Sequence, residues 1–182
     1  MQPLLRGRFG RDYRYEARTA STQRLLEGAS EGAVAVAEEQ TEGRGRLGRT
    51  WRARPGTSVL VSVLLEPPVR SERLPELTLV AGEACSEAIG EATGLATTIK
   101  PPNDVLIGGH KVAGILAEAR DGRVVLGIGI NVNATRDELP AGTDTPSSSL
   151  SLAAGRRFSR AELLAEVLFR LEQRYDAWAS GG

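Results

Sequence analysis

The chain has one cysteine, no net charge and no long apolar run, and each shortage excludes a class of protein. A single cysteine cannot form an internal disulfide, and Cys85 follows the helical spacing of Ala81 and Ala84, which indicates a buried small residue in a reducing compartment. Lys plus Arg and Asp plus Glu both number 23, so no overall field attracts nucleic acid or a membrane surface. No stretch approaches the roughly 20 apolar residues of a membrane span, and residues 1–14 lack the apolar segment of a secretion signal. We therefore expect a soluble, cytoplasmic protein of one domain, residues 1–182.

Lysine is nearly absent as well. All but two of the 23 basic residues are arginine, and the two lysines are Lys100 and Lys111. Lysine differs from arginine in presenting a compact point charge that can sit against a single carboxylate or phosphate oxygen. One interpretation is that both lysines serve a function that arginine cannot. The alternative is that they are ordinary surface residues, and the surroundings of Lys100 and Lys111 decide between the two.

Residues 41–51, by contrast, are rich in glycine and arginine. Within this stretch, glycines and arginines are interleaved and a tryptophan ends the run: Gly43, Arg44, Gly45, Arg46, Gly48, Arg49 and Trp51. Glycine lets the backbone approach a ligand closely, and arginine presents a planar charged fork suited to phosphate and carboxylate oxygens. The composition predicts a loop that binds an anion, with the phosphates of a nucleotide as the favoured ligand.

The remaining patterns predict an α+β protein. Strand-like segments are expected over residues 11–18, 32–40, 57–65, 97–100, 105–107, 112–119 and 123–131. Helical patterns cover residues 75–92 and 159–178, a Ser/Thr helix start lies at 21–26, and 134–149 reads as an irregular surface loop. Because hairpins lie between the helices, we expect a mixed, largely antiparallel sheet with helices covering one face.

Four other interpretations of the loop are weaker. Gly43, Gly45 and Gly48 match the spacing of a dinucleotide fingerprint, but Pro55-Gly56 and a strand follow where that motif needs a helix. No P-loop sequence occurs anywhere in the chain. A nucleic-acid groove needs several stacking aromatics and a positive field, whereas this loop has only Trp51 and the chain has no net charge. A solvated arginine loop without a ligand does not explain why the segment contains three glycines.

A second group of polar and glycine residues lies downstream. Lys100-Pro-Pro-Asn103-Asp104 ends one strand, and Lys111-Val-Ala-Gly114 begins the next but one. Asp104 is a candidate for holding Mg²⁺ or for capping a turn. The sequence 127–133 carries glycine at alternate strand positions, so one face lacks side chains and either admits a flat ligand or packs closely on a helix.

Taken together, these motifs resemble the catalytic domain of the biotin–protein ligases, in order and spacing, over residues 11–178. The elements that carry the resemblance are Ser21-Thr22, Gln40, Gly43-Arg-Gly-Arg-Leu-Gly-Arg49 with Trp51, Lys100-x-Pro-Asn-Asp104, Lys111-x-x-Gly-Ile-Leu116 and Gly127-x-Gly-Ile-Asn-x-Asn133. The family's catalytic domain is similar to class II aminoacyl-tRNA synthetases, which agrees with the expected α+β sheet. The resemblance implies that biotin reacts with Mg·ATP to give biotinyl-5′-AMP, which then acylates a lysine of the biotin carboxyl carrier protein of a carboxylase such as acetyl-CoA carboxylase.

The resemblance also implies a role for each matching residue. Catalysis is expected to depend on Arg46 and Lys111. Biotin is expected to contact Ser21, Thr22, Gln23, Gln40, Gly43, Arg44, Gly45, Arg46, Lys111, Gly114 and Ile115. ATP and the adenylate are expected to contact Arg44, Arg46, Arg49, Trp51, Lys100, Asn103, Asp104, Lys111, Gly129 and Asn131. We further expect the glycine–arginine loop to be mobile without ligand and to fold over biotinyl-AMP.

The chain departs from the family pattern at Gln23, where asparagine is usual, and at Pro101, where an aromatic is usual. The family's small C-terminal domain has no counterpart after Trp178, and no helix-turn-helix precedes the motifs, so we expect no DNA binding. Two other functions remain open: a binding module for biotinyl-AMP or the carrier without turnover, and a lipoate or octanoyl transferase of the same superfamily. A monomer and a homodimer are both compatible with the resemblance.

Overall fold

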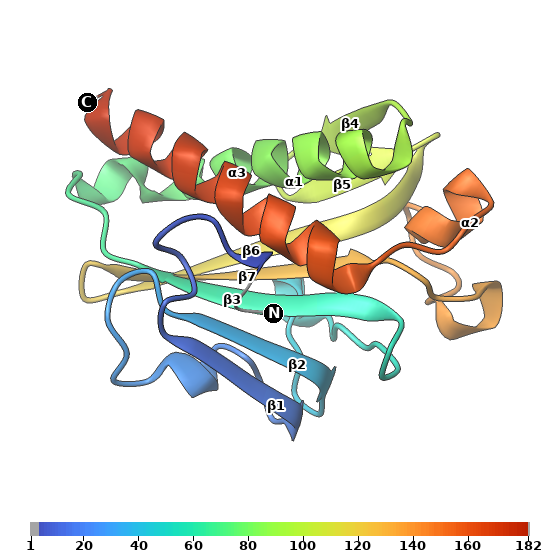
Figure 1. Cartoon of the computed structure of the whole chain (residues 1–182), viewed down its shortest axis with the longest axis horizontal. Coiled ribbons are helices and arrows are strands. Elements are labelled where there is room, and N and C mark those ends of the chain that lie inside the picture. The colour runs from blue at the N-terminus through green and yellow to red at the C-terminus, as the bar shows by residue number, and fades with distance from the viewer. Residues whose placement is uncertain (1–3, 182) are drawn as a thin grey trace.

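The computed structural model describes residues 4–181 and contains one mixed sheet of seven strands (Figure 1). The strands are β1 (Tyr13–Thr19), β2 (Val34–Gln40), β3 (Ser58–Leu65), β4 (Thr97–Lys100), β5 (Asp104–Ile107), β6 (His110–Arg120) and β7 (Arg123–Asn131). Their order is β1-β2-β3-β7-β6-β5-β4, with only β1 and β2 parallel. The predicted α+β class and largely antiparallel sheet are confirmed.

Two long helices, α1 (Leu77–Thr93) and α3 (Arg160–Ser180), lie together across one face of the sheet (Figure 1). The hydroxyl of Ser159 accepts a hydrogen bond from Glu162 N at 3.3 Å and so caps the N-terminus of α3 as the sequence predicted. Shorter turns complete the fold: 3-10 segments at Arg24–Leu26, Arg46–Gly48, Ser71–Glu76 and Arg136–Glu138, and the short helix α2 (Leu150–Ala154). Within residues 4–181, no helix has both the length and the apolar character needed to cross a bilayer.

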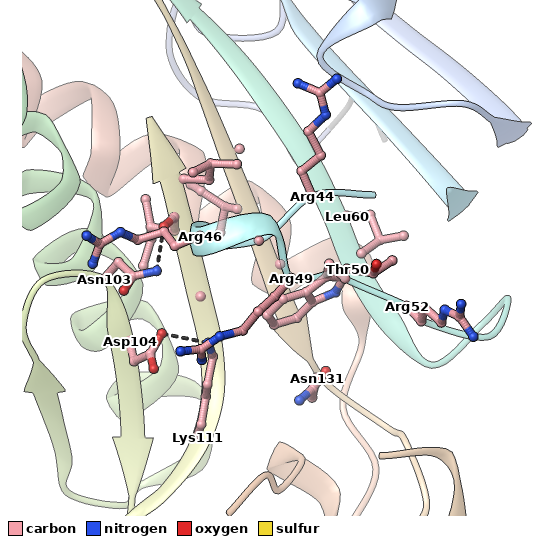
Figure 2. Close-up of a pocket in the computed structure, with 18 of the residues that line it drawn as sticks. Arg44, Arg46, Arg49, Thr50, Arg52, Leu60, Asn103, Asp104, Lys111 and Asn131 are labelled. Carbon is pink, nitrogen blue, oxygen red and sulfur yellow. Dashed lines mark hydrogen bonds and ion pairs between the residues drawn. The ribbon is translucent and has the colours of Figure 1, made fainter. Parts of the chain in front are cut away.

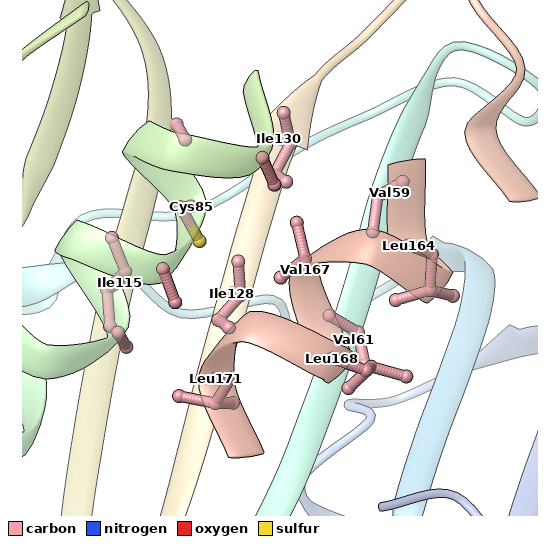
Figure 3. Packing of buried hydrophobic residues seen from close by; sticks show 14 of the residues in the cluster. Val59, Val61, Cys85, Ile115, Ile128, Ile130, Leu164, Val167, Leu168 and Leu171 are labelled. Atoms are coloured by element: carbon pink, nitrogen blue, oxygen red, sulfur yellow. The ribbon is translucent and has the colours of Figure 1, made fainter. Parts of the chain in front are cut away.

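The core lies between the sheet and these two helices (Figure 3). Alternate side chains of β3, among them Val59 and Val61, face Leu164, Val167 and Leu168 of α3. Because successive strand residues point to opposite faces, the same strands present a second set of positions on the side without the two helices. The functional pocket lies on that second face.

Two segments differ from their sequence-based predictions. The helix start predicted at 21–26 forms only a single 3-10 turn over Arg24–Leu26, because the backbone is already extended at Glu27 (ψ 129°) and Gly28 then adopts a φ of 71°. The predicted surface loop 134–149 ends in three buried serines at 147–149, which lead into the missed helix α2. Such serines carry no hydrophobic periodicity, so the pattern offered no sign of their burial.

Burial of Cys85 gives a direct chemical prediction. Its side chain is fully buried between the sheet and α1, and burial raises the pKa of the thiol to about 12. At pH 8 we expect no measurable reaction of the folded protein with a disulfide reagent such as 5,5′-dithiobis(2-nitrobenzoate), and reaction of one thiol after unfolding in guanidinium chloride. Rapid labelling of the native protein would show that α1 opens readily.

Candidate active site

A pocket of about 520 Å³ lies on the sheet face opposite α1 and α3, partly covered by the glycine–arginine loop (Figure 2). Its floor consists of neighbouring positions on β3, β7 and β6, and its far rim comes from residues 100–104 and 140–147. Segments far apart in the sequence therefore meet around one cavity.

The floor of the pocket is made of glycine and is covered by an indole ring. Gly114 and Gly129 are directly paired on β6 and β7. A Cβ at Gly129 would lie 2.5 Å from Cε2 of Trp51, and one at Gly114 would lie 2.9 Å from its Cζ3. The side-chain-free face predicted from the sequence thus exists, and in this structure the chain's own Trp51 lies on it. The indole Nε1 is buried and makes no hydrogen bond to any of residues 4–181.

The glycine–arginine loop is a small hairpin that holds Trp51 in this position. The Gly45 N–H donates to the Arg49 carbonyl at 2.8 Å, and the Trp51 N–H donates to the Gly43 carbonyl at 2.9 Å. At the tip, Leu47 is exposed and has a φ of 57°, a left-handed conformation that costs a leucine about 1–2 kcal/mol. Such strain is concentrated at functional segments.

The arginines of this hairpin point in different directions (Figure 2). Arg46 and Arg49 extend over the side of the pocket that holds Lys111. Arg44 points away, and its guanidinium lies 3.5 Å from Glu118 on β6. Neither Arg46 nor Arg49 forms an ion pair with a carboxylate of residues 4–181, so both charges are available to an anion in the pocket.

Lys111 is held from three directions. Its Nζ forms an ion pair with Asp104 Oδ1 at 2.6 Å and lies 5.5 Å from the centre of the Trp51 ring. Its backbone N–H donates to the Pro146 carbonyl and its carbonyl accepts from Ser148 N, both at 2.8 Å. The two bonds fix the backbone, so the ammonium group has a defined position at the pocket wall.

Two further polar residues of the pocket, Lys100 and Asn131, bind the rim segment 140–149. Lys100 Nζ donates to the Thr145 hydroxyl at 2.6 Å, and Asn131 Nδ2 donates to the Ser148 carbonyl at 3.1 Å. The two lysines of the chain therefore line the same pocket, which argues against two leftover surface residues.

The opposite end of the pocket carries neutral hydrogen-bonding groups. Ser21 and Thr22 are buried, and the Thr22 hydroxyl contacts Gln40 Oε1 at 3.0 Å. Gln23 lies above Gly127, where an added Cβ would be 3.4 Å from its Nε2. The pocket thus joins a cationic end to a neutral polar end.

Nearly all of the predicted site residues meet in this pocket. They are Ser21, Thr22, Gln23, Gln40, Arg44, Gly45, Arg46, Arg49, Trp51, Lys100, Asn103, Asp104, Lys111, Gly114, Ile115, Gly129 and Asn131. Gly43 lies behind the hairpin, where an added Cβ would be 2.4 Å from the Trp51 carbonyl oxygen. Any other residue at this position would place its Cβ against the backbone of Trp51, so the hairpin requires glycine here.

Ile115 lines the pocket and remains a predicted biotin contact, but its side chain points away from the pocket. Its side chain is 1% exposed and belongs to the core beneath α1 (Figure 3). Only its backbone borders the pocket, through the bonds from Ile115 N to the Asn103 carbonyl and from Asn103 Nδ2 to the Ile115 carbonyl. Since Gly114 faces the pocket, strand alternation sends the next side chain to the other face.

The structure adds residues that sequence reasoning missed. Ser62 lines the pocket from the middle of β3, and Thr143, Asp144 and Thr145 line its rim. The position of Ser62 within the apolar run of β3 could have indicated a pocket residue, because a buried hydroxyl needs a hydrogen-bond partner. The rim residues gave no such signal, since only the folded chain brings them near Lys100.

The carboxylates of the pocket are too few to hold Mg²⁺ by themselves. Among residues 4–181, no group of three or more His, Cys, Asp or Glu side chains is arranged to hold a metal ion. Asp104 is the one pocket carboxylate next to Lys111, and it already pairs with that lysine. Mg²⁺ usually binds phosphate oxygens, waters and one or two carboxylates, so Asp104 can contribute one ligand at most.

The Asp104–Lys111 pair leads to a testable expectation. Asp104→Asn keeps the side-chain shape but removes the charge that holds Lys111 Nζ. For the adenylate-forming reaction that the motif resemblance implies, we expect pyrophosphate release to fall about 10-fold. Thermal stability should also fall, because the side chains of Lys111 and Asp104 are only 21% and 15% exposed and the change leaves a largely buried charge without its partner. Asp121→Asn, at an exposed turn, is the control. If excess Mg²⁺ restores the rate, Asp104 acts through the metal and not through Lys111.

Fold and pocket together define a protein of the biotin/lipoate ligase class. The model of the biotin/lipoate A/B protein ligase family matches residues 14–134, and the chain belongs to this family. It is similar to the bifunctional ligase/repressor BirA of Bacillus subtilis, with 42% identity over 159 residues that cover 85% of this chain and 49% of that protein. It is also similar to the biotin–[acetyl-CoA-carboxylase] ligase of Mycobacterium tuberculosis, with 36% identity over 174 residues, 89% of this chain and 63% of that one.

A solved structure supports the same placement. The biotin protein ligase of Aquifex aeolicus, in complex with biotin and ATP, superposes with a TM-score of 0.84 and 35% identity over 94% of this chain and 73% of that chain. The chain spans about half the length of the Bacillus relative.

Proposed function

We propose that the protein ligates biotin to a lysine of a biotin carboxyl carrier protein, in two steps through biotinyl-5′-AMP. In the first step an oxygen of the biotin carboxylate attacks the α-phosphorus of ATP, and the bond to pyrophosphate breaks. In the second step the carrier's lysine amine attacks the carbonyl carbon of the mixed anhydride. An amide forms, and AMP and a proton are released.

The observation that carries this proposal is the division of one pocket into a cationic end and a neutral polar end. Lys111, Arg46 and Arg49 surround the cationic end, where the carboxylate and the α-phosphate would meet. Both ligands are anionic, so bringing them together requires fixed positive charge in a site with little water. Mg²⁺ would neutralise part of the phosphate charge when bound with ATP.

The neutral end favours biotin over other acyl chains. Ser21, Thr22 and Gln40 offer hydroxyl and amide groups that suit the ureido ring of biotin. A dithiolane ring, as in lipoate, has no comparable donors or acceptors and would leave these buried groups unpaired. Relatives named as acetyl-CoA carboxylase ligases support a carboxylase carrier as the acceptor.

The test is incubation with biotin, Mg·ATP and an isolated biotin carboxyl carrier domain, followed by mass spectrometry of the carrier. We expect one biotin on one carrier lysine and no labelling when lipoate replaces biotin. Arg46→Ala should abolish pyrophosphate release, since it removes a charge at the anionic centre. Tight binding of biotinyl-AMP without carrier labelling would favour a module without turnover, and labelling by lipoate would refute the choice of substrate.

A further inference from the structure

Three side chains form a continuous hydrogen-bonded chain at the neutral end of the pocket. Gln40 Oε1 accepts from the Thr22 backbone N–H at 2.8 Å and contacts the Thr22 hydroxyl at 3.0 Å. The Thr22 hydroxyl in turn lies 2.7 Å from the hydroxyl of Ser62. Thr22 is 3% exposed and Ser62 is 0% exposed, so water is not the partner of either group.

The direction of these bonds follows from the donor groups. A backbone N–H can only donate, so the Gln40 atom that faces Thr22 N is the amide oxygen, which can only accept. The Thr22 hydroxyl has one proton, and it must point to this oxygen if that contact is to be a hydrogen bond. The short contact between Thr22 and Ser62 is then satisfied only if the Ser62 hydroxyl donates. The hydrogen bonds are therefore donated in one direction: Ser62 donates to Thr22, and Thr22 donates to Gln40.

This order leaves a defined set of free groups facing the pocket. The amide Nε2 of Gln40 makes no hydrogen bond within the part of the chain that the structure describes, and it remains a donor beside Gly43. Ser62 is fully buried behind Thr22, so the acceptor that faces the pocket is the Ser21 hydroxyl oxygen, which receives the Gln23 N–H at 3.3 Å and retains a second lone pair. A ligand group that satisfies both sets needs a carbonyl oxygen next to N–H donors.

We propose that Ser62 is a positioning residue that fixes the hydrogen-bond polarity of this end and thereby selects a cyclic urea. The inference rests on the proposed function and assigns a role to a side chain outside the motifs that identify the family. Ser62 lies opposite Gly127 on β7, so the hydroxyl and the adjacent glycine position face the same part of the pocket. In a strand of eight buried residues, a hydroxyl at this place does nothing for the core and costs desolvation energy unless it is paired.

The first test compares Ser62→Ala with Ser58→Ala. Both serines are buried on the same face of β3, but Ser58 does not line the pocket, and within residues 4–181 its hydroxyl forms a hydrogen bond only with the Thr57 hydroxyl. The Arg160 side chain binds the Ser58 carbonyl, which the substitution keeps. We expect Ser62→Ala to raise the dissociation constant and KM for biotin about 10-fold, with kcat and KM for ATP changed less than twofold. Ser58→Ala should leave all four quantities within twofold of the wild type.

A second pair separates the hydroxyl from side-chain volume. Ser62→Thr and Ser62→Val have the same shape, and valine flanks this position on both sides in β3. We expect the threonine variant to bind biotin at least five times more tightly than the valine variant. This pair also keeps the proposal testable if alanine at residue 62 prevents folding.

Ligand analogues locate the effect at the urea. Desthiobiotin retains the urea and should lose as much affinity for Ser62→Ala as biotin does. A tetrahydrothiophene-pentanoic acid has the ring and the acid chain without the urea, and its inhibition constant should change less than twofold. An equal loss for this acid, an unchanged affinity for biotin, or equal affinities of the Thr and Val variants would overturn the role of Ser62. Biotinyl-AMP formation by the wild type would still support the proposed function in each of these cases, whereas a wild type that does not bind biotin would refute both.

Discussion

Lys111→Met is expected to lower kcat/KM for adenylate formation by about 10²–10³-fold, the usual cost of removing one preorganised electrostatic group. Methionine retains most of the side-chain length and apolar contact with Trp51, so the loss reports on the charge. The measurement is the initial rate of pyrophosphate release at saturating biotin over a range of ATP concentrations that extends below KM. Lys111 Nζ has a fixed position through its ion pair with Asp104 at the pocket wall, whereas Arg46 and Arg49 form no such pair within residues 4–181.

Arg120→Met is the matched control for this change. Arg120 lies on the same strand, is 93% exposed and pairs only with the adjacent Asp121. Its replacement removes one positive charge without touching the pocket, and we expect activity within twofold of the wild type. Full activity of Lys111→Met would show that the carboxylate and the phosphate meet elsewhere.

The second large effect is expected from Gly129→Ala. The new Cβ would lie 2.5 Å from Cε2, 2.7 Å from Cζ2 and 2.9 Å from Nε1 of Trp51, all atoms of a rigid ring. The indole must leave the floor, and the stem of the hairpin, tied to it by the Trp51–Gly43 backbone bond, must move with it. Misplacement of reacting groups by about 1 Å can cost 10²-fold, and we expect a loss of that order in kcat/KM.

Fluorescence gives an independent measure of this displacement. In a Trp178→Phe background Trp51 is the only tryptophan, and Gly129→Ala should shift its emission to the red as the ring becomes hydrated. Gly127→Ala is the matched control on the same strand and face, because its Cβ would make only ordinary contacts and none with Trp51: the nearest atom is Gln23 Nε2 at 3.4 Å, followed by the Leu116 carbonyl oxygen at 3.6 Å and Ser62 Oγ at 3.8 Å. Its emission should equal that of the parent. Identical spectra for both variants would mean that Trp51 does not rest on the glycine floor in solution.

Much of the architecture could be predicted from local sequence patterns. Period-two alternation and glycine turns located β3, β6 and β7, and the spacing of apolar residues located α1 and α3. The same alternation also contained the information that Ile115 belongs to the core. The motif Lys111-x-x-Gly-Ile-Leu116 places Gly114 and Ile115 next to each other in sequence. Because adjacent residues of a strand face opposite sides, only one of the two side-chain positions can face the pocket.

The site was predictable where residues carry unusual chemistry and not where tertiary contact alone creates a role. The glycine–arginine hairpin and both lysines are recognisable because their residue types are costly or rare. The contact between Lys100 and Thr145 joins residues 45 positions apart, and no periodicity connects them. The position of Trp51 on the glycine floor is a packing result, since the sequence showed a flat empty face but not which ring covers it.

The near absence of lysine makes the pocket unusually easy to monitor chemically. Lys100 and Lys111 are the only lysines of the chain, and both line the same cavity. An amine-directed acylating reagent can therefore modify only this cavity and the terminal amino group. The extent of labelling at the two lysines therefore reports whether a ligand occupies the pocket. It can be measured by intact-mass spectrometry without an engineered probe.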